Sequence, residues 1–148
     1  MRLSKIRVRV GLVGVVIATL GAFGLHRHLQ ARPPEQQPYS SAALSSHLRS
    51  GKIVLLTVDA DWAINPTSRP WFMSADVSRI ARQGGVVAMT ADWTKKTPEV
   101  DNLMAKLNQH NLPAIAIYTP ANPESPAVFT RDHKQSEFLE ALETATRH

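Results

Sequence analysis

Two aspartates that bracket a turn are the first residues whose spacing suggests chemistry. Asp59 and Asp61 follow a continuous apolar run at residues 53–58, and a D-x-D pair can hold a hard cation through its carboxylate oxygens. No third carboxylate is evident nearby in the sequence, and Asp92, at the end of the next apolar run, is only a guess. We therefore favour a solvated loop, and we expect neither a metal site nor a cofactor.

Nucleophiles and metal ligands are sparse in the rest of the chain. The absence of cysteine excludes disulfides, thiolate ligands and any thiol chemistry by the chain itself. No G-x-S-x-G elbow occurs, and Gly84–Gly85 is an isolated pair rather than a phosphate-binding loop. The histidines show no metal-ligand spacing. They are His26, His28, His47, His110, His133 and His148.

The positive charge is confined to one end of the chain. The 148 residues suit one domain, with 17 Lys+Arg against 12 Asp+Glu and a net charge of +5. Residues 1–32 hold six of the basic residues and no acid, so the remainder is close to neutral. A nucleic-acid surface needs clustered basic residues on the folded part, where Lys95–Lys96 is the only adjacent pair. We therefore expect no nucleic-acid binding.

The N-terminal segment has the pattern of a signal-anchor. An uncharged run, Val10–Leu25, follows basic residues, and with flanking residues it predicts a membrane span over residues 6–25. The positive-inside rule then places Met1 in the cytoplasm and the domain across the membrane. We expect that membrane to be an inner membrane, with the domain in the periplasm. Cleavage at a small-x-small site, Ala22 and Gly24, is the alternative, and it would release the domain to the periplasm. We assign residues 1–28 to this segment, 29–40 to a solvated Pro/Gln-rich linker and 41–148 to the folded domain.

From residue 41 the apolar pattern alternates between the periods of helix and strand, which predicts an α/β fold. We expect a central mixed sheet of about four strands, flanked by helices, with an antiparallel hairpin around a Pro-rich loop at residues 119–126. The expected strands are 53–58, 86–89, 114–118 and 127–130, and the expected helices are about Ala42 to Gly51, Trp71–Arg82, Pro98–Leu107 and Gln135–Thr146.

Three short segments, in order along the chain, carry a resemblance to a known family. Residues 60–66 read ADWAINP, residues 90–94 read TADWT, and residues 112–118 read LPAIAIY. They are similar to the A-D-W-C-x-x-C, A-D-W-T and Val-Pro-plus-strand segments of the periplasmic C-terminal domain of DsbD-type thiol:disulfide interchange proteins. The resemblance implies a thioredoxin-like fold from about Ser41 to the C-terminus.

The reactive positions of that family are changed in this chain. Ala63 stands at the nucleophilic Cys and Pro66 at the resolving Cys, while Thr57 stands where the family has a buried Asp. Asn111 replaces the Gly before the Val-Pro pair. Because a thiolate is the group that attacks a disulfide, we expect this chain to be redox-inactive and not an enzyme.

The resemblance further implies that Pro113 is cis and that the backbone before it pairs with an extended peptide, which requires no sulfur. We expect this former active-site face to bind a protein or peptide partner. Three other readings stay open: packing without function, a decayed paralogue, or an accessory subunit of a thiol:disulfide interchange or cytochrome c maturation system whose partner supplies the thiols. The expected binding residues are Trp62, Ala63, Ile64, Asn65, Pro66, Leu112 and Pro113.

Overall fold

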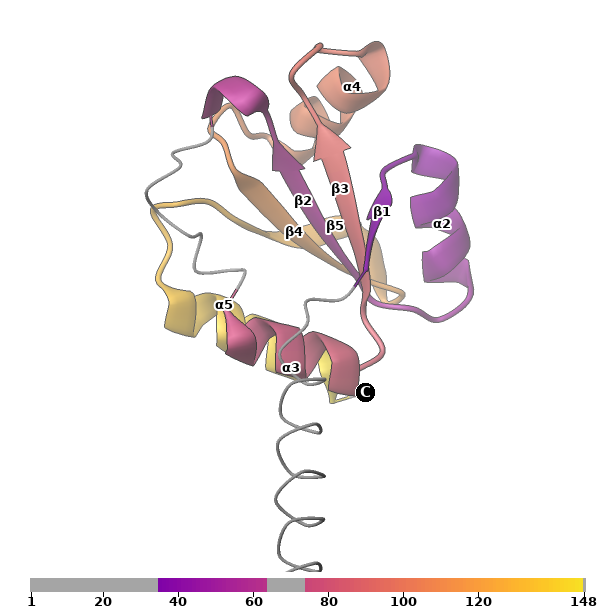
Figure 1. Ribbon diagram of the computed structural model, residues 1–148. Helices are drawn as coiled ribbons and strands as arrows, with labels where there is room; N and C mark the ends of the chain where they lie inside the picture. The colour runs from indigo at the N-terminus through magenta and orange to yellow at the C-terminus, as the bar shows by residue number, and fades with distance from the viewer. Residues whose placement is uncertain (1–34, 64–73, 148) are drawn as a thin grey trace, which may run out of the picture. The chain divides into compact units, whose positions relative to one another are not determined.

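A computed structural model describes residues 35–63 and 74–147 of the chain. Strands and helices alternate through most of it, as the sequence predicts (Figure 1). The strands are β1 (Gln36–Pro38), β2 (Val54–Asp59), β3 (Val87–Asp92), β4 (Ala114–Thr119) and β5 (Asn122–Phe129). The helices are α2 (Ser41–Arg49), α3 (Ala75–Gln83), α4 (Pro98–Leu107) and α5 (Gln135–Thr146), with a 3-10 turn, η1, at Asp61–Ala63.

The sheet is mixed and has five strands in the order β1-β3-β2-β4-β5, one more than expected. Strands β1 and β2 run parallel to β3, whereas β4 is antiparallel to both β2 and β5. The antiparallel β4–β5 hairpin is therefore confirmed. Its second strand begins at Asn122, within the segment 119–126 that we expected to be a loop.

The additional strand, β1, lies inside the segment 29–40 that was expected to be a spacer. Its side chains are exposed, so its sequence has no apolar pattern to reveal it. Polar contacts attach it to β3 instead: Thr90 donates its hydroxyl hydrogen to Gln36 Oε1 at 2.7 Å, and the Tyr39 N–H donates to the Thr90 carbonyl at 2.8 Å. The sheet thus begins before residue 41, the expected start of the domain.

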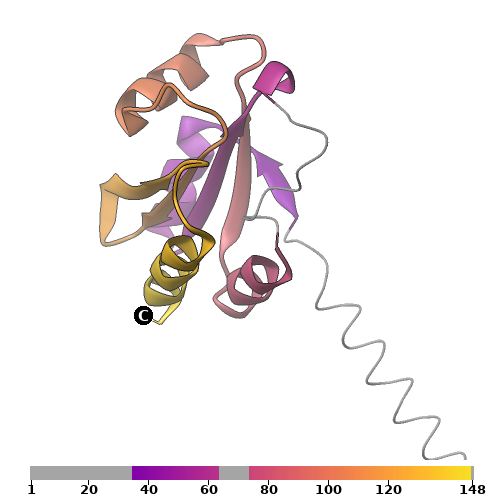
Figure 2. The same ribbon diagram turned by 90° about the vertical axis from the view of Figure 1, so that its left-hand side faces the viewer.

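Helices cover both faces of the sheet (Figure 2). On one face, α2 and α4 pack over Val54, Leu56 and Val58 of β2 together with the even-numbered residues of β4. On the other face, α3 and α5 pack over Leu55 and the odd-numbered Ile115 and Ile117. This alternation explains why β2 and β4 read as continuous apolar runs, because a strand buried on both faces has no polar side.

The helix expected over Trp71–Arg82 begins later than predicted. Ser74 is extended, with φ −67° and ψ 160°, and its Oγ accepts a hydrogen bond from the Val77 N–H, so the helix starts at Ala75. Trp71 lies outside the described residues. Serine is a preferred N-cap residue, and this cap overrides the apolar pattern before it.

The expected membrane span, residues 6–25, lies outside the described residues. Within residues 35–63 and 74–147, no helix has the length and apolar character needed to cross a membrane.

Gly84 allows α3 and α5 to approach each other, which yields a first prediction. A Cβ at this position would lie 2.7 Å from Thr146 Cβ and closer still to Thr146 Cγ2. Gly84→Ala should therefore lower the free energy of unfolding by about 1–3 kcal/mol, measured by urea denaturation. The exposed neighbouring substitution Gln83→Ala serves as control and should change it by less than about 0.5 kcal/mol. Gly84→Ala without any loss of stability would refute this close approach.

Candidate functional site

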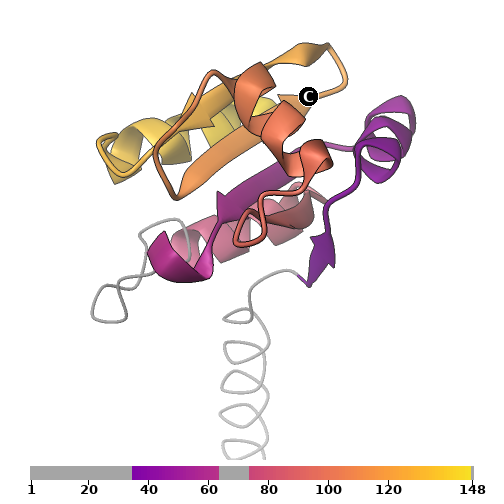
Figure 3. The same cartoon turned by 90° about the horizontal axis from the view of Figure 1, so that it is seen from above.

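The ends of three strands, β2, β3 and β4, meet at one edge of the sheet (Figures 1 and 3). Parallel strands β2 and β3 end in register at Asp59 and Asp92. Strand β4 begins at the same edge, because its first residue, Ala114, pairs with Val58. We call the described residues placed there, Trp62, Ala63, Leu112 and Pro113, the Trp62 face.

Backbone hydrogen bonds fold the segment after β2 into the η1 turn. Asp59 Oδ1 accepts from the Ala60 N–H at 2.8 Å, and the Ala63 N–H donates to the Ala60 carbonyl at 2.9 Å. The Asp61 N–H donates to Thr94 Oγ1 at 3.0 Å, which joins this turn to the one that follows β3. The two turns therefore form one connected support.

Trp62 projects from this support into solvent. Its side chain is 60% exposed. Among the described residues, it is the large hydrophobic side chain that is exposed to solvent. Its ring lies against Trp93, with centroids 6.1 Å apart and planes tilted by 52°, a geometry that aromatic pairs favour. An apolar ring held in position at the surface is suited to contacting a partner.

Trp93 holds Trp62 in position, and it is a residue of the site that was not predicted from the sequence. Its indole Nε1 donates to Asp101 Oδ1 at 2.6 Å, and its ring packs against the core cluster on the α2/α4 face. Lys96 Nζ lies 5.5 Å from the ring centroid, within cation–π range. The sequence signal was a tryptophan followed eight residues later by an acid in the first turn of α4.

The segment before β4 supplies the second half of the Trp62 face. The Leu112–Pro113 peptide bond is cis, which confirms the expectation for Pro113. Pro113 is buried, whereas Leu112 is half-buried and packs at the margin of the core cluster. The Leu112 main chain makes no hydrogen bond within the residues that the structure describes.

Two carboxylates of this region, Asp92 and Asp59, accept hydrogen bonds from their own turns. The Thr94 hydroxyl and then the Thr94 backbone N–H, at 2.8 Å from Oδ1, lower the pKa of the exposed Asp92 carboxyl. Asp59 is bonded to Ala60, as described above. Among the described residues, no three His, Asp or Glu side chains gather as a metal ion would require.

The positions of the family's reactive groups carry no acid or thiol here. Ala63 ends η1, and Thr57 is 8% exposed on β2, at the position that the resemblance assigns to a buried Asp. Three expected binding residues, Ile64, Asn65 and Pro66, lie outside the described residues. The arrangement thus offers apolar and aromatic surface beside backbone that has no hydrogen-bond partner among the described residues.

Comparisons with family models and with curated proteins find no match. Solved structures do match this fold. A thioredoxin from Thermus thermophilus is 17% identical, with a TM-score of 0.58 over 76% of this chain and 87% of that one. Spinach chloroplast thioredoxin F is 18% identical, with a TM-score of 0.53 over 78% and 96%. The oxidised DsbD C-terminal domain of Neisseria meningitidis is 21% identical, with a TM-score of 0.51 over 70% and 90%. The chain therefore has a thioredoxin-like fold, without cysteine.

The Trp93–Asp101 hydrogen bond provides a second prediction. Asp101→Ala removes a charge-assisted bond and an acid at the start of α4, so the free energy of unfolding should fall by about 1–2 kcal/mol. Asp101→Asn retains an oxygen acceptor for the indole and should lose less. Urea denaturation measures both changes, and the Trp93 indole proton resonance should shift strongly only in the alanine variant. Equal losses in both variants would show that the helix charge, not the hydrogen bond, sets the stability.

Proposed function

We propose that this chain is a redox-inactive, thioredoxin-like binding module that holds a protein or an extended peptide on the Trp62 face. The observation that carries the proposal is Trp62 itself, which remains 60% exposed on a hydrogen-bonded support although no thiol is present for it to serve. A residue retained only for packing would bury its ring.

The energy available from this ring is sufficient for a binding contact. Covering the exposed part of one tryptophan releases roughly 2–4 kcal/mol by burial of apolar surface. Tryptophan is also enriched among the interface residues that contribute most to affinity. Because Trp93 already orients Trp62, binding would cost less side-chain conformational entropy than it would with a mobile ring.

The backbone beside Pro113 supplies directional recognition. Leu112 has an N–H and a C=O without hydrogen-bond partners in the described part of the chain, at the point where β4 begins. An extended segment can bond to both groups by strand addition, while its side chains contact Trp62 and Leu112. This mode of binding requires no reactive group.

We further propose that residues 6–25 anchor the module in an inner membrane, with the domain in the periplasm. The support is the sequence pattern: an uncharged run preceded by basic residues and followed by a near-neutral remainder.

A binding experiment tests the Trp62 face directly. Peptides selected by display against the purified domain should bind at least tenfold more weakly to Trp62→Ala, because the variant loses the apolar contact. Glu140→Ala, an exposed position on α5, is the matched control and should bind as the unmodified domain does. Leu112→Asp should also weaken binding. Unchanged affinity in both Trp62→Ala and Leu112→Asp would refute this site. If full-length chain recovered from membranes holds a dithiol protein on this face, the accessory-subunit function would replace the one proposed.

Redox activity provides an independent prediction. In the reduction of insulin by dithiothreitol, the unmodified chain should give the background rate because it has no cysteine. The double substitution Ala63→Cys with Pro66→Cys should exceed that rate, whereas Ala63→Ser with Pro66→Ser should not. Acceleration by the unmodified chain would overturn the redox-inactive assignment.

A further inference from the structure

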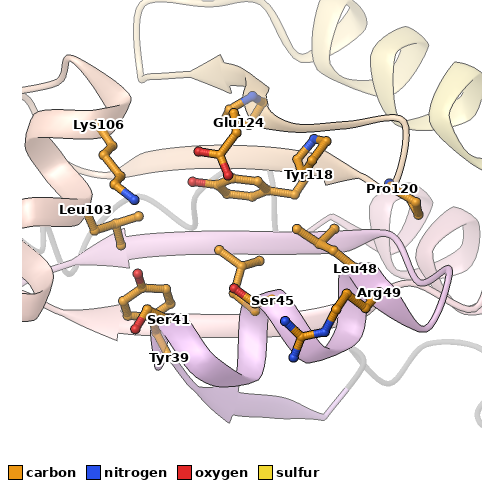
Figure 4. Close-up of a pocket in the computed structure, with 13 residues that line it drawn as sticks. Tyr39, Ser41, Ser45, Leu48, Arg49, Leu103, Lys106, Tyr118, Pro120 and Glu124 are labelled. Atoms are coloured by element: carbon orange, nitrogen blue, oxygen red, sulfur yellow. The ribbon is translucent and has the colours of Figure 1, made fainter.

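A second candidate site lies on the α2/α4 face of the sheet and shares no residue with the Trp62 face. An open cavity of about 430 Å³ is bounded by α2, α4 and the β4–β5 hairpin (Figure 4). It adjoins a hollow of about 560 Å³ along α4, and Tyr39 and Lys106 line both. These volumes fall in the range of small-molecule sites. We call the first the tyrosine cavity.

The floor of the tyrosine cavity is apolar. Leu44 and Leu48 of α2, Leu103 of α4 and the ring of Tyr118 are all at most 9% exposed and still line it. Pro120 and Pro126 of the hairpin also line it. An apolar chain or ring would therefore find a preformed surface here.

The Tyr118 hydroxyl opens into the cavity, although the residue as a whole is buried. The side chain is only 5% exposed, yet its hydroxyl makes no hydrogen bond to any described residue. Burial, with smaller contributions from Tyr39 and Glu124, raises the pKa of Tyr118 to about 12. The group is thus a protonated donor at neutral pH, and it is accessible to an acceptor bound in the cavity.

Cations outnumber anions among the charged side chains that line the cavity. Lys106 from α4 and Glu124 from β5 are both directed toward it, and Arg49 lies at the end of α2 on the rim (Figure 4). None of the three forms an ion pair with a described residue. Two cations, one anion and a neutral donor leave the cavity with a net preference for one negative charge.

From this geometry we infer that the tyrosine cavity binds a small amphiphilic monocarboxylate, a single carboxylate joined to an apolar chain. The carboxylate accepts hydrogen bonds from the Tyr118 hydroxyl and the Lys106 ammonium, and the chain lies over Leu44 and Leu48 of the floor. Glu124 repels a second negative charge, so dicarboxylates are disfavoured. This site is independent of the proposed function of the Trp62 face.

Calorimetry with octanoate as the probe tests the carboxylate requirement. The full-length chain should bind octanoate and should bind octanamide, the neutral analogue of equal length, at least tenfold more weakly. Octanedioate, with a carboxylate at each end, should also bind more weakly. Absence of octanoate binding, or equal binding of octanoate and octanamide, would overturn the proposal.

Three substitutions in the cavity should act with defined signs. Lys106→Met should weaken octanoate binding about tenfold and Tyr118→Phe roughly threefold to tenfold, because each removes a donor to the carboxylate. Glu124→Gln should strengthen binding, because it removes a like charge. Lys95→Met, an exposed lysine outside the cavity, is the matched control and should bind as the unmodified chain does.

Thermal unfolding without ligand separates binding from folding in these variants. Lys106 and Glu124 are exposed, so their substitution should change the midpoint temperature of unfolding by no more than a few degrees from that of the unmodified chain. Octanoate affinity unchanged in Lys106→Met, or weakened in Glu124→Gln, would refute the assigned geometry.

The carboxyl terminus of an apolar peptide also joins a carboxylate to an apolar chain. A further comparison distinguishes peptide termini from free acids. An acetylated trileucine with a free carboxyl group is compared with its amidated form. Binding of octanoate without binding of the peptide acid assigns the cavity to free acids. Tighter binding of the peptide acid than of octanoate, lost on amidation, assigns it to peptide termini. Peptide binding that survives amidation would refute the carboxylate requirement.

Discussion

The position of β2 at the centre of the sheet is the constraint on which the rest of the structure depends. This strand is hydrogen-bonded along both edges, to β3 and to β4, and Val54–Val58 are buried on both faces. A strand so enclosed tolerates no shift of register, because a shift by one residue would exchange its two apolar faces. Its end at Asp59 is therefore fixed. The Trp93 N–H donates to the Asp59 carbonyl at 2.8 Å, so β2 sets the position of the turn that holds the Trp62 face.

The elements that the sequence predicted well are those whose burial is visible in the residues themselves. Strands β2 and β4 are continuous apolar runs, and α4 shows Val100, Leu103 and Leu107 at helical spacing after a proline at its start. Strand β1 was not predicted, because its three exposed residues have no apolar period and depend on backbone pairing with β3. Most of β5 was not predicted for the same reason, because residues 122–125 are exposed. Two prolines also made the segment resemble a loop.

The candidate site was predicted only where a motif carried it. Trp62, Leu112 and the cis Pro113 followed from the resemblance, and the structure places them at the one edge where β2 ends and β4 begins. The support of Trp62 by Trp93 and Asp101 was not predicted, because it joins two loops and a helix through side chains. The tyrosine cavity could not be predicted from the sequence either, since its walls come from α2, α4 and the β4–β5 hairpin, which only the topology brings together.

The prolines of the two outermost strands affect how this molecule meets other chains. Strand β5 forms one margin of the sheet and contains Pro123 and Pro126, which have no N–H to offer; β1, at the other margin, is three residues long and ends with Pro38. Exposed strand edges are where sheets of separate molecules join and aggregate. Here both margins are blunted, so copies held at high local density would resist edge-to-edge pairing. Under the proposed function, an extended partner is then left with the short stretch of backbone before Pro113. Selectivity would follow from the small number of sites at which a partner strand can pair.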